Sequence, residues 1–551
     1  MNIHMLDTLA GQEHHRQSGY KERIHCCTVA GCLSAGALPV RRAIEEQVAS
    51  TGQSERIEVC GTGCLGLCSR GPLVRSQSKD LVFTNVTPAD AVAVVRGDES
   101  EFEGRTLPAS HPFYGGQKRV ILANSGYTDP ERIESYIDRG GYLGLRRAVS
   151  EMTPSEIVAE IKTSRLRGRG GAGYPAGLKW ELVARQSQPV KYVVCNADEG
   201  DPGAFMNRSV LEGDPHRVLE GMAIAGRAVG AHQGYVYARG ESPLAIARVR
   251  TALEQARRFG LLGSRLFDSD FTFNIDVRVG AGAYVCGEET ALIASIEGKR
   301  GQPVPRPPYP PERGLWGAPT LINNVETFAN IAGIIQNGAA WFASIGSKSS
   351  PGTKVFALAG RIVRAGLVEV PIGTSLRTML FDLGGGVPPG FEFKAAQTGG
   401  PAGGCIPAQY LDVAMDYDSL TAIGSMMGSG GLIVMDTSTC MVDVARFFME
   451  FCMDESCGKC IPCRTGTVQM HDILSRMTRG DAGEEDLDML ASLCGLLKET
   501  SLCGLGLAAP NPVVSTMLHF KDEYQAHLRD HRCPAGHCEM TGTVETQEVH
   551  A

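Results

Sequence analysis

The chain has 551 residues, 43% of them hydrophobic and 21% charged, with a formal charge of −8 and a pI near 6.0. This predicts roughly three or four globular domains and excludes a fibrous or disordered chain. The acidic balance argues against a nucleic-acid partner, and no apolar run reaches the ~18–20 residues of a membrane span. The N-terminus lacks an apolar secretory core, so we expect a cytoplasmic protein without a membrane segment.

Glycine and cysteine are unusually frequent, with 67 and 18 residues respectively. Without a secretory signal, so many cysteines are more typical of metal ligands or buried thiols than of disulfides. Their grouping near both ends of the chain favours metal sites.

Residues 24–97 are predicted to form a small α/β unit of thioredoxin-like order, in which strands at IHCC, RIEVC and DLVFTNV alternate with helices. Two cysteine pairs follow strands: Cys27 with Cys32, and Cys64 with Cys68. Two thiolates from each of two loops suit a [2Fe–2S] cluster.

The choice of cysteines in this unit is ambiguous, because Cys60 with Cys64 has the same C-x3-C spacing as Cys64 with Cys68. We favour Cys64 and Cys68, because we expect their glycine-bracketed loop to be more exposed. A redox-active disulfide is the alternative, although a C-x2-C motif would be expected there.

Residues 98–118 are polar and contain Pro and Gly, which predicts a linker. From 119 to 346, strands alternate with helices, which indicates an α/β domain. One of these helices begins with a capping box formed by Thr153 and Glu156.

The segment GRGGAG places Gly168, Gly170 and Gly173 in a G-x-G-x-x-G pattern. It follows a helix, whereas the ordinary dinucleotide fingerprint follows a strand. Bare glycine backbone still lets a phosphate approach the N–H groups, and Arg167, Arg169 and Lys179 add positive charge. We therefore expect a phosphate-bearing cofactor bound in a non-standard way.

Three polar loops follow predicted strands or precede predicted helices in this domain. Such side chains can bind a cofactor or cap a helix, and the sequence leaves both possibilities open. The loops contain Asn196, Asp198, Glu199 and Asp201; Gly287, Glu288 and Glu289; and Asn323, Asn324 and Thr327.

Residues 350–435 have short β-branched strands and frequent glycines, typical of a β-grasp-like insert. Residues 436–530 have the 3.6-residue apolar period of helices, and the polar segment 531–551 is predicted to be a loose tail.

The helical region contains the motif CGKCIPC, with cysteines at 457, 460 and 463. Three thiolates at this spacing suit one [4Fe–4S] cubane, and Cys503 is the natural fourth ligand. Zinc, or no metal at all, are the alternatives to a cubane held by Cys457, Cys460, Cys463 and Cys503. Cys533 and Cys538 form a further C-x4-C pair without a nearby partner in the sequence.

The motifs TSRLRGRGGAGYPAGLKWE, NADEGDPGAFMNR, GAYVCGEETALI, PTLINNVETFANI and ESCGKCIPCRTGT…SLCGLG together resemble the NADH-oxidising flavoprotein of respiratory complex I. They also resemble its relatives, the diaphorase subunits of hydrogenases and the β-subunit of NAD-dependent formate dehydrogenase. The likeness covers about residues 119–525. It implies a Rossmann-like FMN- and NAD-binding domain, with a thioredoxin-like [2Fe–2S] domain fused in front and a cubane cluster in a helical bundle behind.

The resemblance also implies roles for individual residues. Asp201 and Glu289 would face the nicotinamide and ribose side of the dinucleotide, and NAD(H) is favoured over NADP because these carboxylates would repel a 2′-phosphate. Tyr174 and Tyr309 would stack on the rings in place of the usual Phe, and Arg306 stands where the family often has Lys. The cofactor-binding set would be Gly168, Arg169, Gly170, Gly171, Gly173, Tyr174, Lys179, Asn196, Asp198, Glu199, Tyr284, Gly287, Glu288, Arg306, Tyr309, Asn323, Asn324 and Thr327.

The implied activity is hydride transfer between NAD(H) and FMN, followed by single-electron transfer to iron–sulfur clusters. We expect a diaphorase subunit whose partners are catalytic subunits of a larger redox complex with further clusters. A free-standing NADH dehydrogenase that reduces a quinone or another small acceptor is the alternative.

Overall fold

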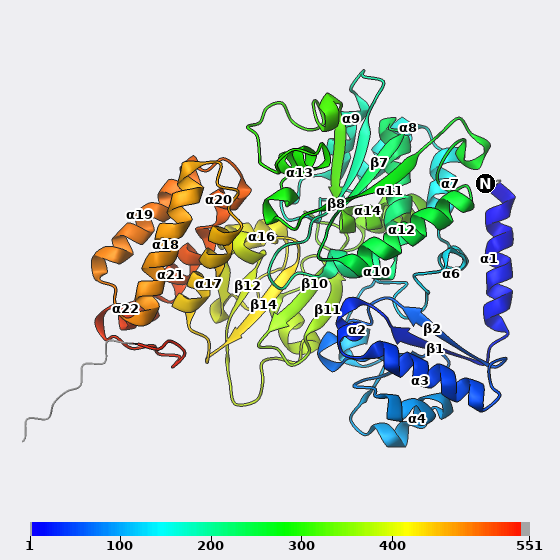
Figure 1. The fold of residues 1–551 in the computed structure, drawn as a ribbon, viewed down its shortest axis with the longest axis horizontal. Coiled ribbons are helices and arrows are strands. Elements are labelled where there is room, and N and C mark those ends of the chain that lie inside the picture. The colour runs from blue at the N-terminus through cyan, green and yellow to red at the C-terminus, as the bar shows by residue number, and fades with distance from the viewer. Residues whose placement is uncertain (1–2, 541–551) are drawn as a thin grey trace, which may run out of the picture.

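The computed structural model describes residues 3–540, and Figure 1 shows their arrangement. Three β-sheets form within this range, followed by a group of helices at the C-terminal end. The mixed α/β fold predicted from the sequence is confirmed. No helix in the described part of the chain is both long enough and apolar enough to cross a membrane.

The first sheet has the strand order β2-β1-β3-β4-β5. Its strands are β1 (Glu22–Cys27), β2 (Ile57–Thr62), β3 (Val74–Ser76), β4 (Leu81–Phe83) and β5 (Thr106–Pro108). Its helices are α2 (Ala30–Ser34), α3 (Ala37–Ser50) and α4 (Ala91–Arg96), and α1 (Ile3–Ser18) precedes it.

Strand β5 lies within the range predicted as a linker, so the first sheet continues past residue 97. Its three residues pair antiparallel with β4, with Val82 opposite Leu107. Three residues are too few to show the alternating pattern of a strand. Whether such a segment becomes a strand depends on the neighbour with which it pairs.

The second sheet is wholly parallel, with the order β8-β7-β6-β9. Its strands are β6 (Tyr192–Ala197), β7 (Gln233–Arg239), β8 (Asn274–Gly280) and β9 (Thr320–Asn324). The helices around it include α6 (Ile133–Asp138), α7 (Leu143–Ser150), α8 (Pro154–Thr163), α9 (Ala176–Ala184), α10 (Met206–Gly213), α11 (Pro215–Val229), α12 (Pro243–Arg258), α13 (Glu289–Ile296) and α14 (Val325–Asn337).

Helix α11 is buried along almost its whole length and packs against α14 and β6 at the centre of this domain. The capping box predicted at the start of α8 is confirmed: the Thr153 N–H donates to Glu156 over 2.8 Å, and the Glu156 N–H donates to Thr153 Oγ1 over 3.3 Å.

The third sheet has the order β11-β10-β14-β12-β13, in which only β10 and β14 run parallel. Its strands are β10 (Thr353–Gly360), β11 (Gly366–Pro371), β12 (Phe393–Thr398), β13 (Cys405–Pro407) and β14 (Gly431–Asp436), with α16 (Tyr417–Ala422) between β13 and β14.

The C-terminal helices lie beside the third sheet, at the left of Figure 1. They are α17 (Met441–Asp454), α18 (Ile461–Arg479), α19 (Glu484–Thr500), α20 (Gly504–Ala508), α21 (Asn511–His519) and α22 (Lys521–Arg529). Of the predicted tail, residues 531–540 are described, and 541–551 lie outside the described residues.

Candidate functional site: two cysteine clusters and a glycine loop

The four cysteines chosen for a [2Fe–2S] cluster come together at one end of the first sheet. Cys27 ends β1, Cys32 lies in α2, and Cys64 and Cys68 follow β2. Cys27 Sγ hydrogen-bonds to both Cys32 and Cys64, and Cys64 Sγ lies 4.0 Å from Cys68 Sγ. One small cluster can therefore contact all four sulfur atoms.

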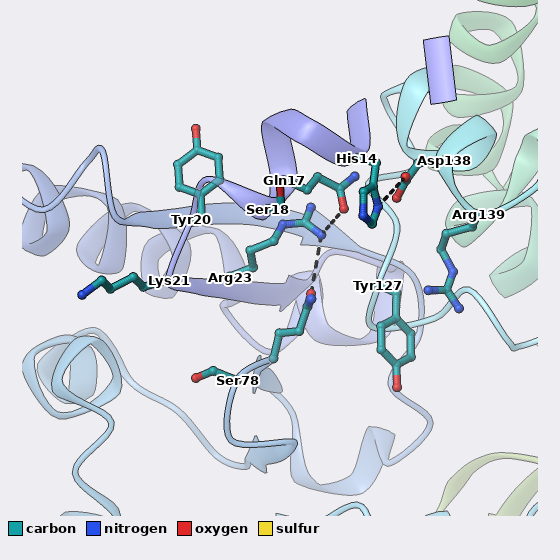
Figure 2. A pocket seen from close by; sticks show the side chains of 11 residues that line it. His14, Gln17, Ser18, Tyr20, Lys21, Arg23, Ser78, Tyr127, Asp138 and Arg139 are labelled. Carbon is teal, nitrogen blue, oxygen red and sulfur yellow. Dashed lines mark hydrogen bonds and ion pairs between the residues drawn. The ribbon is translucent and has the colours of Figure 1, made fainter. Parts of the chain in front are cut away.

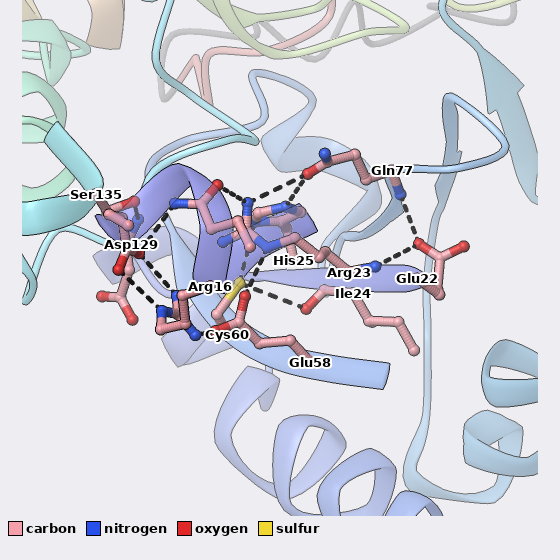
Figure 3. Close-up of polar contacts among 12 residues, drawn as sticks. Arg16, Glu22, Arg23, Ile24, His25, Glu58, Cys60, Gln77, Asp129 and Ser135 are labelled. Atoms are coloured by element: carbon pink, nitrogen blue, oxygen red, sulfur yellow. Dashed lines mark hydrogen bonds and ion pairs between the residues drawn. The ribbon is translucent and has the colours of Figure 1, made fainter. Parts of the chain in front are cut away.

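Cys60 points away from this group. Its Sγ lies 3.2 Å from His25 Nδ1, and Figure 3 shows the pair inside a polar network with Arg23 and Gln77. Burial lowers the pKa of His25 to about 4 and raises that of Cys60 to about 12. This geometry supports Cys64 and Cys68 rather than Cys60 and Cys64.

The loop from Cys64 is buried as far as Leu67, whereas Cys68 is half-buried and Ser69 is exposed. Gly66 accepts a hydrogen bond from the Leu367 N–H over 2.7 Å, and the Ser69 N–H donates to Ala365 over 3.0 Å. The loop is thus covered by β11, which lies some 300 residues later in the chain. Sequence pattern alone cannot reveal such a cover.

The glycine loop lies near a topological switch point of the second sheet. The chain passes from β6 outward to β7 and β8 and then returns to β9 on the other side of β6. Open α/β sheets bind ligands at the carboxyl ends of the strands where this reversal occurs. Asn196 at the end of β6 is in register with Asn324 at the end of β9.

The loop between α8 and α9 approaches this edge with its backbone. A Cβ on Gly170 would lie 3.2 Å from Asn324 Cβ, and one on Gly173 would lie 2.6 Å from the Tyr417 ring. Gly173 also has a φ of +64°, which favours glycine. Gly170 is exposed at this edge, and its bare backbone suits a phosphate.

The side chain of Arg169 does not contribute charge to the loop. It is fully buried, and its guanidinium donates to the backbone oxygens of Pro351 and Thr353 over 2.8 and 3.2 Å. Its own N–H donates to Thr327 Oγ1 over 2.9 Å. Arg169 therefore holds the shape of the loop. The prediction that its charge faces a cofactor does not agree with these contacts.

Glu199 also has a structural role in place of the predicted cofactor contact. Its carboxylate accepts hydrogen bonds from the N–H groups of Asn207 and Arg208, both over 2.9 Å, at the start of α10. Burial raises its pKa, and these hydrogen bonds oppose the rise.

Several predicted residues cap helices or brace neighbouring side chains at the switch point. Glu288 accepts from the N–H groups at the start of α13, and Asn324 accepts from the N–H of Glu326 at the start of α14. Asn323 accepts from Trp180 Nε1, and Asn196 donates to the backbone oxygen of Gly287, each over 2.9 Å. The helix-capping role that the sequence left open is therefore present, and it holds these loops around the carboxyl edge of the second sheet.

Two buried aspartates stand beside the edge. Asp198 forms a 3.2 Å ion pair with Arg239, yet burial raises its pKa to about 7. Asp201 accepts from the Tyr284 hydroxyl over 2.6 Å and from the Ser429 hydroxyl over 2.8 Å. Burial raises the pKa of Asp201 as well, and these two hydrogen bonds oppose the rise.

Among the remaining predicted residues, three form a chain of charges and two are exposed tyrosines. Glu289 lies 3.4 Å from Lys179 and 2.7 Å from Arg306. Tyr174 and Tyr309 are both about half exposed, with relative exposures of 48% and 50%. Their rings are therefore available for stacking on a planar ligand.

The sequence interpretation missed residues contributed by the third sheet. Tyr417 donates from its hydroxyl to the Gly168 oxygen over 2.8 Å, and Ser429 holds Asp201. Gly400 and Gly428 pack close to Asp201 and Gly171 respectively. The GGPAGG and GSGG segments were the available signal, because bare backbone often marks such close packing.

The four cysteines predicted to hold a [4Fe–4S] cluster line one small pocket. Cys460 precedes α18 and Cys503 precedes α20, so both lie at helix N-termini, which favour the negative charge of thiolates. Burial raises the pKa of Cys463 to about 11, and the neighbouring cysteines act in the same direction.

This pocket adjoins the switch-point edge of the second sheet. Val285 lines it, and the neighbouring Tyr284 bonds to Asp201. Glu455 accepts from the Tyr284 N–H over 2.9 Å, and Lys459 donates to the backbone oxygen of Pro303 over 2.6 Å. The cysteine loop is thus tied directly to the α/β domain.

A wider cavity of about 670 Å³ lies elsewhere, between α1, β1 and the segment around Tyr127 and Asp138 (Figure 2). His14 pairs with Asp138 over 3.3 Å at its rim. None of the predicted site residues lines it.

The comparisons with known proteins agree with this geometry. Residues 161–333 match the Nuo51 FMN-binding domain, and residues 443–527 match the NADH-ubiquinone oxidoreductase-F iron-sulfur binding region. The chain is 57% identical over 431 residues to the NADP-reducing hydrogenase subunit HndC of Solidesulfovibrio fructosivorans, covering 78% of this chain and 88% of that one.

It is also 46% identical over 415 residues to an NADH-quinone oxidoreductase subunit of Rhizobium meliloti (strain 1021), covering 75% of this chain and 99% of that one. A crystal structure of NAD+-reducing [NiFe]-hydrogenase in the H2-reduced state superimposes with a TM-score of 0.67 at 28% identity, covering 96% of this chain and 91% of that chain. The chain therefore belongs to the NADH-oxidising flavoprotein family, whose members carry FMN and iron–sulfur clusters as diaphorase subunits of multi-subunit oxidoreductases.

Proposed function

We propose that FMN binds at the switch point between β6 and β9, and that NAD(H) stacks on it between Tyr174 and Tyr309. The observation that carries this proposal is the exposed backbone of Gly170 beside Asn324, which is in register with Asn196, inside the segment that matches the FMN-binding domain. When bound, FMN would accept two electrons together as a hydride and release them one at a time.

The protein's own groups bind and orient rather than act as strong acids or bases. Loop N–H groups and Lys179 would hold the phosphate. Asn196 and Asn323 offer amide groups to a ring edge. Asp201 and Glu289 present carboxylates to the dinucleotide, and we propose that Glu289 would repel the 2′-phosphate that NADP carries on its adenosine ribose.

These carboxylates favour NAD(H), although the similar HndC is named as a subunit of an NADP-reducing hydrogenase. The choice is tested by kcat/KM for NADH and NADPH with a viologen acceptor. We expect a clear preference for NADH in the natural chain, and a smaller preference in Glu289→Gln. Equal rates with both nucleotides would contradict this assignment.

The flavin site itself is tested by Lys179→Met. Lys179 reaches Glu289 and the backbone oxygen of Ile322, and we expect the variant to lose FMN during purification. Lys162→Met is the matched control, because Lys162 pairs with Glu181 on the exposed face of the same helix pair. Equal FMN content in both variants would exclude this site.

We further propose that the first sheet and its helices form a thioredoxin-like [2Fe–2S] domain ligated by Cys27, Cys32, Cys64 and Cys68. The third sheet is proposed as the β-grasp-like domain. Cys457, Cys460, Cys463 and Cys503 then bind the [4Fe–4S] cluster through which electrons leave. No disulfide links any of the 18 cysteines, all of which lie within the described residues.

The partners are proposed to be catalytic subunits of a redox complex that carries further clusters, with hydrogen or formate as the terminal substrate. An anaerobic affinity purification from the native host, followed by mass spectrometry, tests this. A stoichiometric hydrogenase or molybdopterin subunit would support the proposal and name the substrate. A chain recovered alone, with FMN and clusters intact and with quinone reductase activity, would favour the free-standing dehydrogenase.

A further inference from the structure

A tyrosine and an arginine near the N-terminal cysteine set lack the partners that their polar groups need. Tyr114 lies in the short helix α5 (Pro112–Gly115), inside the stretch that the sequence predicted as a linker. Arg119 directly follows that stretch, on the way from the first sheet to the second. The function proposed above uses neither residue.

The hydroxyl group of Tyr114 is an unsatisfied donor. Its oxygen atom is buried and has no hydrogen-bond partner within the described residues. Such groups are rare in folded proteins, because a buried hydrogen bond that is not made costs free energy. A bound group that accepts a hydrogen bond would remove this cost.

The positive charge of Arg119 also lacks a partner. Its Nε donates to Gln117 Oε1 over 3.4 Å, and its guanidinium carbon lies 5.1 Å from the centre of the Tyr114 ring. In the described part of the chain, no carboxylate forms an ion pair with it. Glu369 lies nearby, but both of its oxygens accept hydrogen bonds from the N–H groups of residues 120–122. A half-buried guanidinium therefore stands without a counter-charge.

Packing places these groups against the loop that carries Cys64 and Cys68. The Tyr114 ring lies 5.1 Å from the ring of Phe113, measured between centres. A Cβ on Gly66, in the middle of the cysteine loop, would lie 3.3 Å from the Phe113 ring. Tyr114 also packs against the hydrophobic core that contains Cys27, Cys32 and Cys64.

Electrostatic effects connect the same groups. Burial raises the pKa of Tyr114, the charge of Arg119 opposes the rise, and the thiols of Cys64 and Cys27 add to it. Burial lowers the pKa of Arg119, and the charges of Tyr114, Glu369 and Cys64 oppose that fall. Negative charge at the cysteine set therefore acts on both residues.

A [2Fe–2S] cluster fits these two unsatisfied groups. Two ferric ions, two sulfides and four thiolates carry a net negative charge, and their sulfur atoms accept hydrogen bonds. The negative charge would offset the guanidinium, and a sulfur atom would accept from the tyrosine hydroxyl. The cluster would thus supply both of the partners that the chain itself does not provide.

We propose that Tyr114 and Arg119 set the reduction potential of the [2Fe–2S] cluster, the first as a hydrogen-bond donor to sulfur and the second as a nearby positive charge. This inference rests on the cluster site proposed above. Reduction adds one negative charge, so both groups stabilise the reduced cluster more than the oxidised one and raise its potential. Neither residue supplies a ligand, so both are positioning residues.

The test uses the full chain, purified anaerobically with FMN and both clusters, in a potentiometric titration followed by electron paramagnetic resonance. Arg119→Gln should make reduction of the [2Fe–2S] cluster roughly tenfold less favourable, which lowers its potential by ~59 mV for one electron. Tyr114→Phe keeps the ring and should lower the potential by a smaller amount. Arg119→Lys keeps the charge and should restore most of the lost potential.

Arg105→Gln is the matched control. Arg105 belongs to the same N-terminal unit, and its guanidinium carbon also lies over a ring, 4.6 Å from the centre of Phe102, but it pairs with Asp90 over 3.1 Å. This variant should leave the potential unchanged. A merely structural role of Arg119 would reduce the iron content and leave the potential of the remaining clusters unchanged.

The possible failures are distinguishable. Unchanged potentials in Arg119→Gln and Tyr114→Phe, with the [2Fe–2S] signal present, would overturn this inference and leave the cluster assignment intact. An equal shift in Arg105→Gln would overturn it as well. A natural chain without a [2Fe–2S] signal would overturn the cluster assignment, and this inference with it.

Discussion

The two cysteine clusters of this chain are built in opposite ways. The N-terminal set uses loops at the ends of β1 and β2, and three of its four cysteines are buried in the main hydrophobic core. The C-terminal set sits at the starts of α18 and α20, with Cys457 and Cys460 partly exposed. The first arrangement would shield a bound cluster from its surroundings, and the second would leave one side of a bound cluster accessible.

The largest expected effect comes from breaking the exposed set. Cys460→Ser removes a soft ligand, so the [4Fe–4S] signal in electron paramagnetic resonance should disappear. Steady-state viologen reduction should fall by at least about 100-fold, because loss of even a hydrogen bond to a metal ligand costs roughly 10–100-fold. Reduction of bound FMN by NADH in one turnover should persist, and its loss would show that the substitution damaged the flavin site instead.

The buried set gives a sharper test of ligand choice. Cys27→Ser should abolish the [2Fe–2S] signal and leave the [4Fe–4S] signal intact. Cys60→Ser is its control, since Cys60 faces His25 and should keep both signals. If Cys60→Ser lost the [2Fe–2S] cluster, the ligand set would need to be reassigned.

Replacing one glycine in each cysteine loop by alanine compares how tightly the two loops are packed. A Cβ at Gly66, where φ is +93°, would lie 2.9 Å from the Leu367 oxygen, so Gly66→Ala adds a clash of about 1–3 kcal/mol to backbone strain of about 1–2 kcal/mol. Gly458 has a φ of +73° and only an Arg464 side-chain atom 3.8 Å away, so Gly458→Ala should cost only the strain, about 1–2 kcal/mol. Chemical denaturation measures both, and equal costs would contradict the buried cover seen at Gly66.

A smaller effect concerns Asp198, which lies in the flavin region between the two clusters. Burial raises its folded pKa from 3.8 to about 7, so the folded state binds this proton more tightly than the unfolded state. This aspartate therefore contributes stability below pH 4 that is lost as the pH rises toward 7. The melting temperature should fall less between pH 5 and 7 in Asp198→Asn than in the natural chain; identical slopes would refute the assignment.

Local motifs in the sequence allowed correct prediction of some features. The Thr153–Glu156 box caps its helix because capping depends on neighbours along the chain. The CGKCIPC cysteines are also close in sequence, and Cys503, forty residues on, joins them in one pocket. The α/β domain was predicted from alternating strands and helices, and its parallel sheet brings Asn196 to Asn324 at the switch point.

Features that depend on distant segments could not be predicted. The burial of Arg169 depends on backbone oxygens more than 180 residues away, and Asp201 is held by Ser429 from another sheet. The hydrogen bonds of Glu199 to the start of α10 could not be predicted either, because a carboxylate that follows a strand can bind a ligand or cap a helix. Cys533 and Cys538 form a recognisable C-x4-C pair, but no spacing in the sequence reveals that the fold brings Cys440 and His527 beside them.

The cover that β11 places over the Cys64–Cys68 loop has a consequence for how the protein is made. β11 is synthesised some 300 residues after the loop, yet its backbone and that of Ala365 bond to Gly66 and Ser69. Iron and sulfide reach the N-terminal cysteines more easily before this contact forms than afterwards. We therefore expect maturation to have a preferred order, in which insertion of the cluster precedes docking of the third sheet.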